Sequence, residues 1–127
     1  MTRRILVVED TEDNRQIVRD LLTSAGFEVL EATDGAAGLA LAGTSRPDLV
    51  IMDVQLPVMD GYEATRRLKS DPALRAIPVI AVTSYALSGD EERSRAAGCD
   101  GYLSKPFSPS YLLRMVRGFL GDDPHHA

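Results

Sequence analysis

The sequence predicts an α/β protein in which five β/α units form a doubly wound, five-stranded parallel sheet. Short apolar runs, mostly β-branched, alternate along the chain with segments of helical spacing. The apolar runs contain no polar alternation, which is typical of strands buried on both faces of a parallel sheet. No internal repeat or long linker interrupts this order. Right-handed crossovers would then place helices on both faces of the sheet.

Each element follows from a local pattern. The apolar runs predict strands at residues 5–8, 29–30, 49–52, 79–82 and 102–103. Apolar stripes at helical spacing, together with capping residues, predict the intervening helices. The first helix has its apolar stripe at residues 17–25, with Glu12 expected in its opening turn. The other helices are expected at about residues 34–45, 62–70, 89–97 and 109–120.

Several helix boundaries carry their own signals. Gly26 and Gly98 follow the first and fourth helices and are expected to end them. Asp71–Pro72 breaks the chain after the third helix. Ser108–Pro109 supplies an N-cap and a proline at the first position of the last helix. Gly61 is expected to lie in a loop before the third helix, where the chain must turn.

Length and composition exclude several classes of protein. A chain of 127 residues is one domain, and we expect residues 1–121 to form it and residues 122–127 to be a loose tail. A net charge of −5 argues against a nucleic-acid-binding domain. No apolar run approaches the roughly 18 residues that a membrane span needs. The apolar run after Arg4 is shorter than a signal peptide's apolar region, so a signal peptide is not expected. The single cysteine, Cys99, cannot form an internal disulfide, so a cytoplasmic location is expected.

Polar side chains gather at the predicted carboxyl ends of the strands. In chain order they are Glu9, Asp10, Asp53, Thr83 and Lys105. Open α/β sheets carry their ligand sites at this edge, so these groups are expected to converge. Mg²⁺ prefers oxygen ligands, an aspartate can accept a phosphoryl group, and a lysine can offset the charge that arrives. The pattern therefore predicts phosphoryl transfer to Asp53.

Four motifs surround these positions: ILVVED at 5–10, MDVQLPVMDG at 52–61, VTS at 82–84 and LSKPF at 103–107. Together they resemble the receiver domain of bacterial two-component response regulators, over residues 4–120. Residues 75–83 and 89–93 are similar to stand-alone cell-division receivers of the DivK type. The resemblance implies the flavodoxin-like receiver fold. It also implies a phosphoacceptor signalling domain and not an enzyme, because such a domain catalyses only its own phosphorylation and dephosphorylation.

The same resemblance implies a metal site and an acceptor. Asp53 is expected to accept the phosphoryl group. Asp10, Asp53 and the main-chain carbonyl of Gln55 are expected to hold Mg²⁺, for which Mn²⁺ can substitute. Glu9 is expected to support the metal, directly or through water.

Further roles are implied for the ends of the last two strands. Lys105 is expected to contact the phosphoryl group, and the Lys105–Pro106 peptide bond is expected to be cis. Thr83 is the expected switch hydroxyl, and Tyr102 is the expected switch aromatic ring. These two residues would transmit phosphorylation to the fourth helix, the fifth strand and the fifth helix, where a downstream protein target would bind.

The implied phosphoryl donor is a histidine kinase or a histidine phosphotransfer protein. We expect it to dock near the first helix, beside Asn14 and Ile17, and we expect no nucleic-acid or membrane partner. Because the numbering runs from Met1 to a short tail, a complete small protein is favoured. One alternative is a receiver excised from a hybrid histidine kinase or a larger regulator. Another is an aspartate-nucleophile phosphatase, although such an enzyme would carry a second acid where Gln55 stands.

Overall fold

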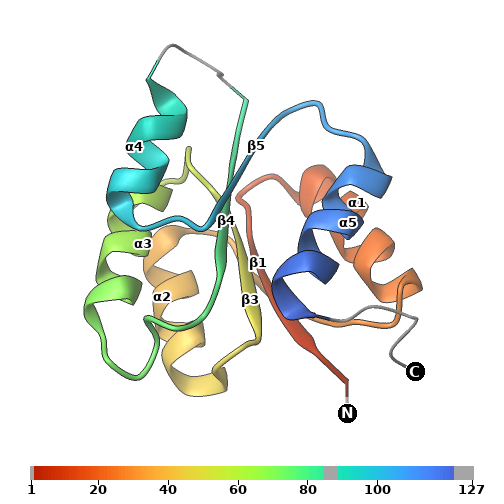
Figure 1. The fold of residues 1–127 in the computed structure, drawn as a ribbon, viewed down its shortest axis with the longest axis horizontal. Coiled ribbons are helices and arrows are strands. Elements are labelled where there is room, and N and C mark those ends of the chain that lie inside the picture. Colours follow the sequence, from red (N-terminus) through yellow and green to blue (C-terminus); the bar gives the residue numbers. More distant parts are fainter. Residues whose placement is uncertain (1, 85–88, 122–127) are drawn as a thin grey trace.

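A computed structural model places one five-stranded sheet between two layers of helices (Figure 1). It describes residues 2–84 and 89–121, so the tail expected at 122–127 lies outside the described residues. The strands are β1 Arg4–Val8, β2 Glu28–Ala32, β3 Leu49–Asp53, β4 Val79–Thr83 and β5 Gly101–Ser104. The helices are α1 Glu12–Ser24, α2 Gly35–Ser45, α3 Gly61–Ser70, α4 Asp90–Ala97 and α5 Pro109–Leu120. No helix in these two described ranges is long and apolar enough to cross a membrane.

All strand pairs are parallel, and the strand order is β2-β1-β3-β4-β5. The chain first moves outward from β1 to β2 and then returns to β3 on the other side of β1. This reversal between β1 and β3 is the switch point at which doubly wound sheets hold ligands. The predicted fold class is therefore confirmed, together with its flavodoxin-like strand order.

Central strands send alternate side chains into two separate cores. Ile5 and Ile51 belong to the core that packs against α1 and α5, whereas Leu6 and Met52 belong to the core on the other face. Figure 1 shows α2, α3 and α4 in the layer that covers this other face. These four side chains are buried, and burying each contributes about 1.5–3 kcal/mol relative to exposure. Cys99 is buried with the second group, as expected for a small apolar residue. Burial on both faces explains why the strands show no polar alternation.

Side-chain caps begin α2, α3 and α5, whereas α1 and α4 begin without one. Asp34 Oδ1 accepts a hydrogen bond of 2.7 Å from the Ala37 amide at the start of α2. Ser108 Oγ accepts one of 3.0 Å from the Tyr111 amide at the start of α5. Caps of this kind are worth about 1 kcal/mol each. The Ser108 cap also marks the end of the loop that carries Lys105.

Strand β2 is longer than the predicted residues 29–30. It pairs with β1 over five residues, from Arg4 opposite Glu28 to Val8 opposite Ala32. As an edge strand it is only partly covered, so it tolerates glutamates that interrupt the apolar run. The apolar run alone therefore underestimated its length.

Gly61 does not lie in a loop, contrary to the prediction. It is the first residue of α3, and its φ is not positive. A Cβ at this position would lie 2.8 Å from the Cα of Val54 and still closer to the carbonyl oxygen of Asp53. Glycine is needed there because α3 starts directly against the backbone of Asp53.

Candidate functional site

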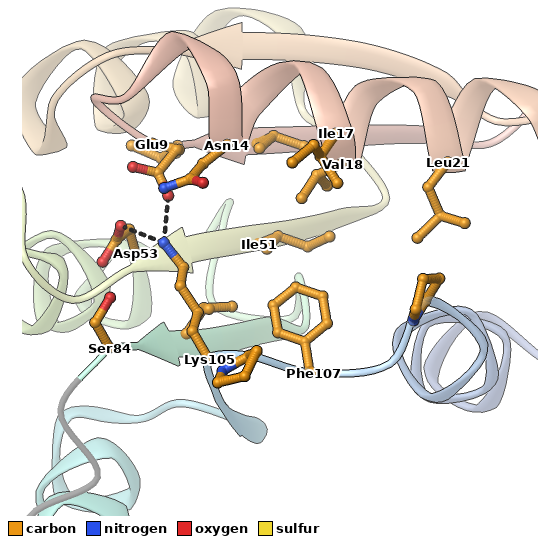
Figure 2. Close-up of a pocket in the computed structure, with 15 residues that line it drawn as sticks. Glu9, Asn14, Ile17, Val18, Leu21, Ile51, Asp53, Ser84, Lys105 and Phe107 are labelled. Atoms are coloured by element: carbon orange, nitrogen blue, oxygen red, sulfur yellow. Dashed lines mark hydrogen bonds and ion pairs between the residues drawn. The ribbon is translucent and has the colours of Figure 1, made fainter.

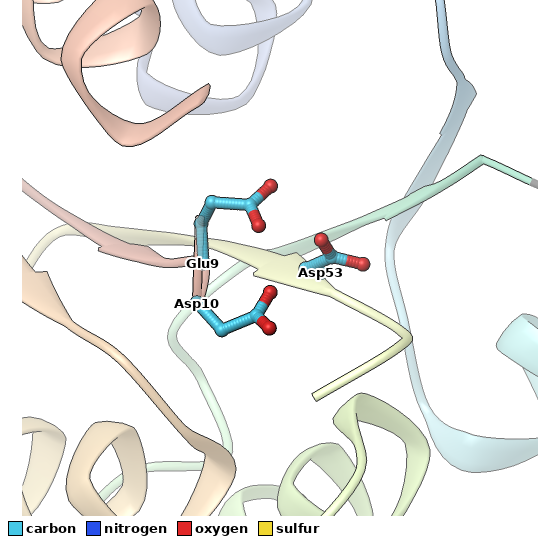
Figure 3. A group of neighbouring side chains, drawn as sticks. All are labelled: Glu9, Asp10 and Asp53. Carbon is cyan, nitrogen blue, oxygen red and sulfur yellow. The ribbon is translucent and has the colours of Figure 1, made fainter. Parts of the chain in front are cut away.

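Three carboxylates meet at the carboxyl ends of β1 and β3 (Figure 3). Glu9 and Asp10 follow β1, and Asp53 ends β3. One carboxylate oxygen from each residue lies within 4.8 Å of the others. Glu9 and Asp53 are buried, whereas Asp10 is exposed. The structure thus brings together three residues that the sequence predicted to converge.

Lys105 reaches into this cluster from the connection between β5 and α5 (Figure 2). Its Nζ donates hydrogen bonds of 2.6 Å to Glu9 Oε1 and 3.2 Å to Asp53 Oδ2. The Lys105–Pro106 peptide bond is cis, which confirms that prediction. Burial alone would lower the pKa of Lys105, but its hydrogen bonds and the charges of Glu9 and Asp53 hold this pKa above its usual value. The lysine is therefore a fixed cation at the site.

Both oxygens of the Asp53 carboxylate have donors. The backbone amide of Gln55 donates to Oδ1 at 2.9 Å, and Lys105 donates to Oδ2 at 3.2 Å. Gln55 was expected to contribute its carbonyl; the contact to Asp53 made by its amide was not predicted. Two donors on one carboxylate hold its plane in place. The orientation of Asp53 is thus determined by the protein itself.

The donor set fits a hard divalent cation. Three carboxylates lie close together with one ammonium group beside them, which leaves a net negative charge. Mg²⁺ takes oxygen ligands and keeps several waters, so it needs only one or two carboxylates from the protein. Glu9, Asp10 and Asp53 are sufficient for such a site.

Thr83 and Tyr102 lie on the next two strands of the sheet. Thr83 ends β4 and is buried, while Tyr102 lies in β5 opposite Ala81. Ala81 and Tyr102 pack with the α2, α3 and α4 layer, and strand alternation turns Thr83 toward the same face. Burial raises the pKa of Tyr102, and the charge of Asp90 in α4 raises it further. The expected switch residues therefore share one face of the sheet, beside α4.

An apolar cleft of 490 Å³ opens next to the carboxylates (Figure 2). It runs between α1 and the connection from β5 to α5. Glu9, Asp53 and Lys105 line its polar end. Its remaining walls include Asn14, Ile17, Val18, Leu21, Ile51 and Phe107. Ile17 is 64% exposed although its side chain is large and apolar.

Two features of the site were missed by sequence reasoning. Asn14 and Ile17 were expected near the rim, but nothing in the sequence pattern indicated the deeper wall formed by Phe107 and Leu21. The sequence also did not single out Arg15, whose guanidinium donates a hydrogen bond of 2.9 Å to the main-chain carbonyl of Glu9. A contact to a main-chain oxygen leaves no motif of residue types. Only the arrangement of α1 against β1 reveals it.

The chain has clear relatives among known proteins. Residues 5–117 match the family model described as the response regulator receiver domain. The chain is 46% identical over 122 residues to the polar-differentiation response regulator DivK of Brucella ovis. That alignment covers 96% of this chain and 99% of the relative.

Solved structures of receiver domains are also similar to this chain. The signal receiver domain of a signal transduction histidine kinase from Syntrophus aciditrophicus has a TM-score of 0.89 at 33% identity, over 97% of this chain and 93% of that one. The receiver domain of a sensor histidine kinase from Pseudomonas aeruginosa has a TM-score of 0.89 at 38% identity, over 95% and 99% of the two chains. The Pseudomonas structure has a magnesium ion coordinated in its active site cleft.

Proposed function

Because this chain belongs to the response regulator receiver domain family, we propose that Asp53 accepts a phosphoryl group from a phosphohistidine donor. As a DivK-like response regulator, the protein is a member of the two-component signalling proteins. One observation carries the proposal for Asp53. Its buried carboxylate ends the central strand β3, beside Glu9, Asp10 and Lys105. We infer a signalling domain that catalyses only its own phosphorylation and dephosphorylation.

We assign the metal site to the same cluster. Asp10, Asp53 and the main-chain carbonyl of Gln55 would hold Mg²⁺, with Glu9 in support, and Mn²⁺ could replace it. When bound, the cation neutralises charge on the phosphoryl oxygens. Support comes from the convergence of the three carboxylates and from the magnesium-bound Pseudomonas receiver.

The transfer itself requires positioning more than covalent chemistry. An oxygen of Asp53 attacks the phosphorus atom, a P–O bond forms, and the P–N bond of the phosphohistidine breaks. The electron pair of that bond returns to the imidazole ring of the donor. The amide of Gln55 and the Nζ of Lys105 hold Asp53 in place before the attack. Lys105 then contacts an oxygen of the new phosphoryl group and offsets its charge.

The apolar cleft supports donor docking beside α1. A histidine kinase or a histidine phosphotransfer protein would present its phosphohistidine at the polar end of the cleft. Its apolar side chains would cover Ile17 and Phe107, which line the cleft. Ile17 is exposed in the free protein, so covering it contributes favourable burial.

Output would leave by the face of α4, β5 and α5. The phosphoryl oxygens would attract the Thr83 hydroxyl, and Tyr102 would enter the space that the hydroxyl vacates. Phosphorylation shifts this equilibrium only if it stabilises one arrangement more than the other. The target is a protein in the cytoplasm, and a net charge of −5 disfavours a nucleic-acid target.

A second candidate is the same receiver chemistry within a larger protein. Two of the matching structures are receiver domains of histidine kinases. The chemistry at Asp53 would be unchanged in that setting, and only the route of the output would differ. The length of the gene distinguishes these two cases.

Labelling with acetyl phosphate or a phosphohistidine donor tests the proposal. Wild-type protein should be labelled in the presence of Mg²⁺ and lose most of that labelling on chelation. Asp53→Asn should not be labelled, because it keeps the shape and removes the nucleophile. Asp60→Asn is the matched control: Asp60 is an exposed N-cap, and asparagine caps helices equally well. Labelling of Asp53→Asn at the wild-type level would overturn the assignment.

A further inference from the structure

Arg15 in α1 is largely buried, and its guanidinium has partners on every side. Its side chain is only 12% exposed. Nη1 donates a hydrogen bond of 2.9 Å to the main-chain carbonyl of Glu9, and Nε donates one of 3.1 Å to Glu31 Oε1. Nη2 also pairs with Glu12. Arg15 thus links α1, strand β2 and the segment that follows β1.

The carbonyl of Glu9 belongs to the peptide group that joins Glu9 to Asp10. On its N-terminal side, Glu9 is held to the sheet because its amide donates to the carbonyl of Ala32 at 3.0 Å. On its C-terminal side, the chain has left β1 and not yet entered α1. Arg15 supplies the hydrogen bond that holds this peptide group. The direction of the Asp10 side chain depends on the orientation of that peptide. The Glu9 carboxylate has donors of its own, the Thr11 amide at 3.1 Å and Lys105 Nζ at 2.6 Å.

Arg15 acts through geometry more than through charge. Its positive charge is balanced by Glu12 and Glu31, whose side chains are more exposed than its own. Arg19 pairs with the same Glu31, at 2.8 Å, and with Asp20, so the network holds two arginines, two glutamates and one aspartate. Little net charge is left to act on the carboxylate cluster. The hydrogen bond to the Glu9 carbonyl distinguishes Arg15 from Arg19.

We propose that Arg15 is a positioning residue for the metal site. It holds the Glu9–Asp10 peptide and thereby directs the Asp10 carboxylate toward Asp53. This inference rests on the proposed function, because it requires that the cluster bind Mg²⁺. It goes beyond that function by making metal affinity depend on a residue of α1 that is not itself a metal ligand.

Calorimetric titration with Mg²⁺ tests this inference. Arg15→Met keeps most of the length of the side chain and removes the guanidinium. Its Mg²⁺ affinity should fall by about tenfold, the effect typical of losing a group that orients a metal ligand. Arg19→Met is the matched control, because it removes a guanidinium of the same network and helix, and its affinity should stay within about twofold of wild type. In acetyl phosphate labelling, Arg15→Met should need more Mg²⁺ but approach the wild-type rate at saturation.

Arg15→Lys distinguishes the effect of hydrogen-bond geometry from the effect of charge. It also replaces Arg15→Met in the test if the methionine variant does not fold. Lysine keeps the charge but lacks the planar fork that reaches Glu9 and Glu31 together, so its Mg²⁺ affinity should also fall. Wild-type affinity in folded Arg15→Met or Arg15→Lys would overturn the inference. An equal loss in Arg19→Met would do the same. Absence of Mg²⁺ binding by the wild type would instead refute the proposed function.

Discussion

Gly61 joins the start of α3 to the backbone of the proposed acceptor Asp53. Its amide donates a hydrogen bond of 2.9 Å to the carbonyl of Val54. A Cβ at this position would lie 2.8 Å from the Cα of Val54 and 3.0 Å from the carbonyl carbon of Asp53. Both neighbours are backbone atoms, which cannot rotate away as a side chain can. Replacing Gly61 by alanine should therefore push α3 and the end of β3 apart.

The size of the effect follows from these distances. Ordinary van der Waals contact begins at about 3.4 Å, so the new methyl group would be about 0.6 Å too close to the Cα of Val54. It would overlap the carbonyl oxygen of Asp53 by more than that, so this overlap is a lower limit. Overpacking of this kind costs about 1–3 kcal/mol of unfolding free energy. Alanine is favoured over glycine in a helix by about 0.5–1 kcal/mol, which offsets only part of that cost. We expect a net loss of at least about 1–2 kcal/mol for Gly61→Ala.

Urea unfolding measures this loss, with Gly43→Ala as the matched control. Gly43 lies in α2, and a Cβ added there would have nothing within 4 Å, so alanine should stabilise the protein by about 0.5–1 kcal/mol. With a slope of about 1–3 kcal/mol per molar urea, the two variants should shift the midpoint in opposite directions. Phosphorylation of folded Gly61→Ala should also be slower, because the Asp53 backbone has moved. Equal stability of Gly61→Ala and wild type would refute this account of the contact.

Three further predictions concern the charged site and the switch. In the absence of divalent cations, wild type should be more stable than Lys105→Met at neutral pH. The pKa of Lys105 in the folded protein is raised above 10.5, so this stability advantage should be lost as the pH rises through that pKa. A stability advantage that persists in strong alkali would contradict the ion-pair argument. Asp10→Ala should weaken Mg²⁺ binding much more than Glu12→Ala, because Asp10 is in the carboxylate cluster whereas Glu12 is the first residue of α1. Titration calorimetry measures both affinities, and equal values would show that the cluster is misassigned. In pull-down experiments with beryllofluoride, a phosphoryl mimic, Thr83→Ala and Tyr102→Ala should each reduce the mimic-dependent capture of the target, and unchanged capture would exclude the proposed route to the output face.

Residue patterns were sufficient to predict the fold and most of the site. In a parallel sheet buried on both faces, each strand appears in the sequence as an apolar run, and the carboxyl ends of all strands lie at the same edge. Asp53 and Lys105 could therefore be predicted to approach each other although 52 positions separate them in the chain. This prediction needs only the order of elements and the handedness of their connections. It does not need any side-chain distance.

Other features depended on distances that no residue pattern encodes. Three contacts could be seen only in the packed structure. They are the hydrogen bonds of Lys105 to both Glu9 and Asp53, the contact of Arg15 with a main-chain carbonyl, and the close approach of Gly61 to the backbone. A shift of about 1 Å between a helix and a strand would break such contacts and leave the apolar periodicity unchanged. The sequence by itself determined which chemical groups meet at one edge of the sheet. The tertiary structure alone decided which atoms of those groups touch, because hydrogen bonds and steric contacts vary steeply with distance whereas hydrophobic burial does not.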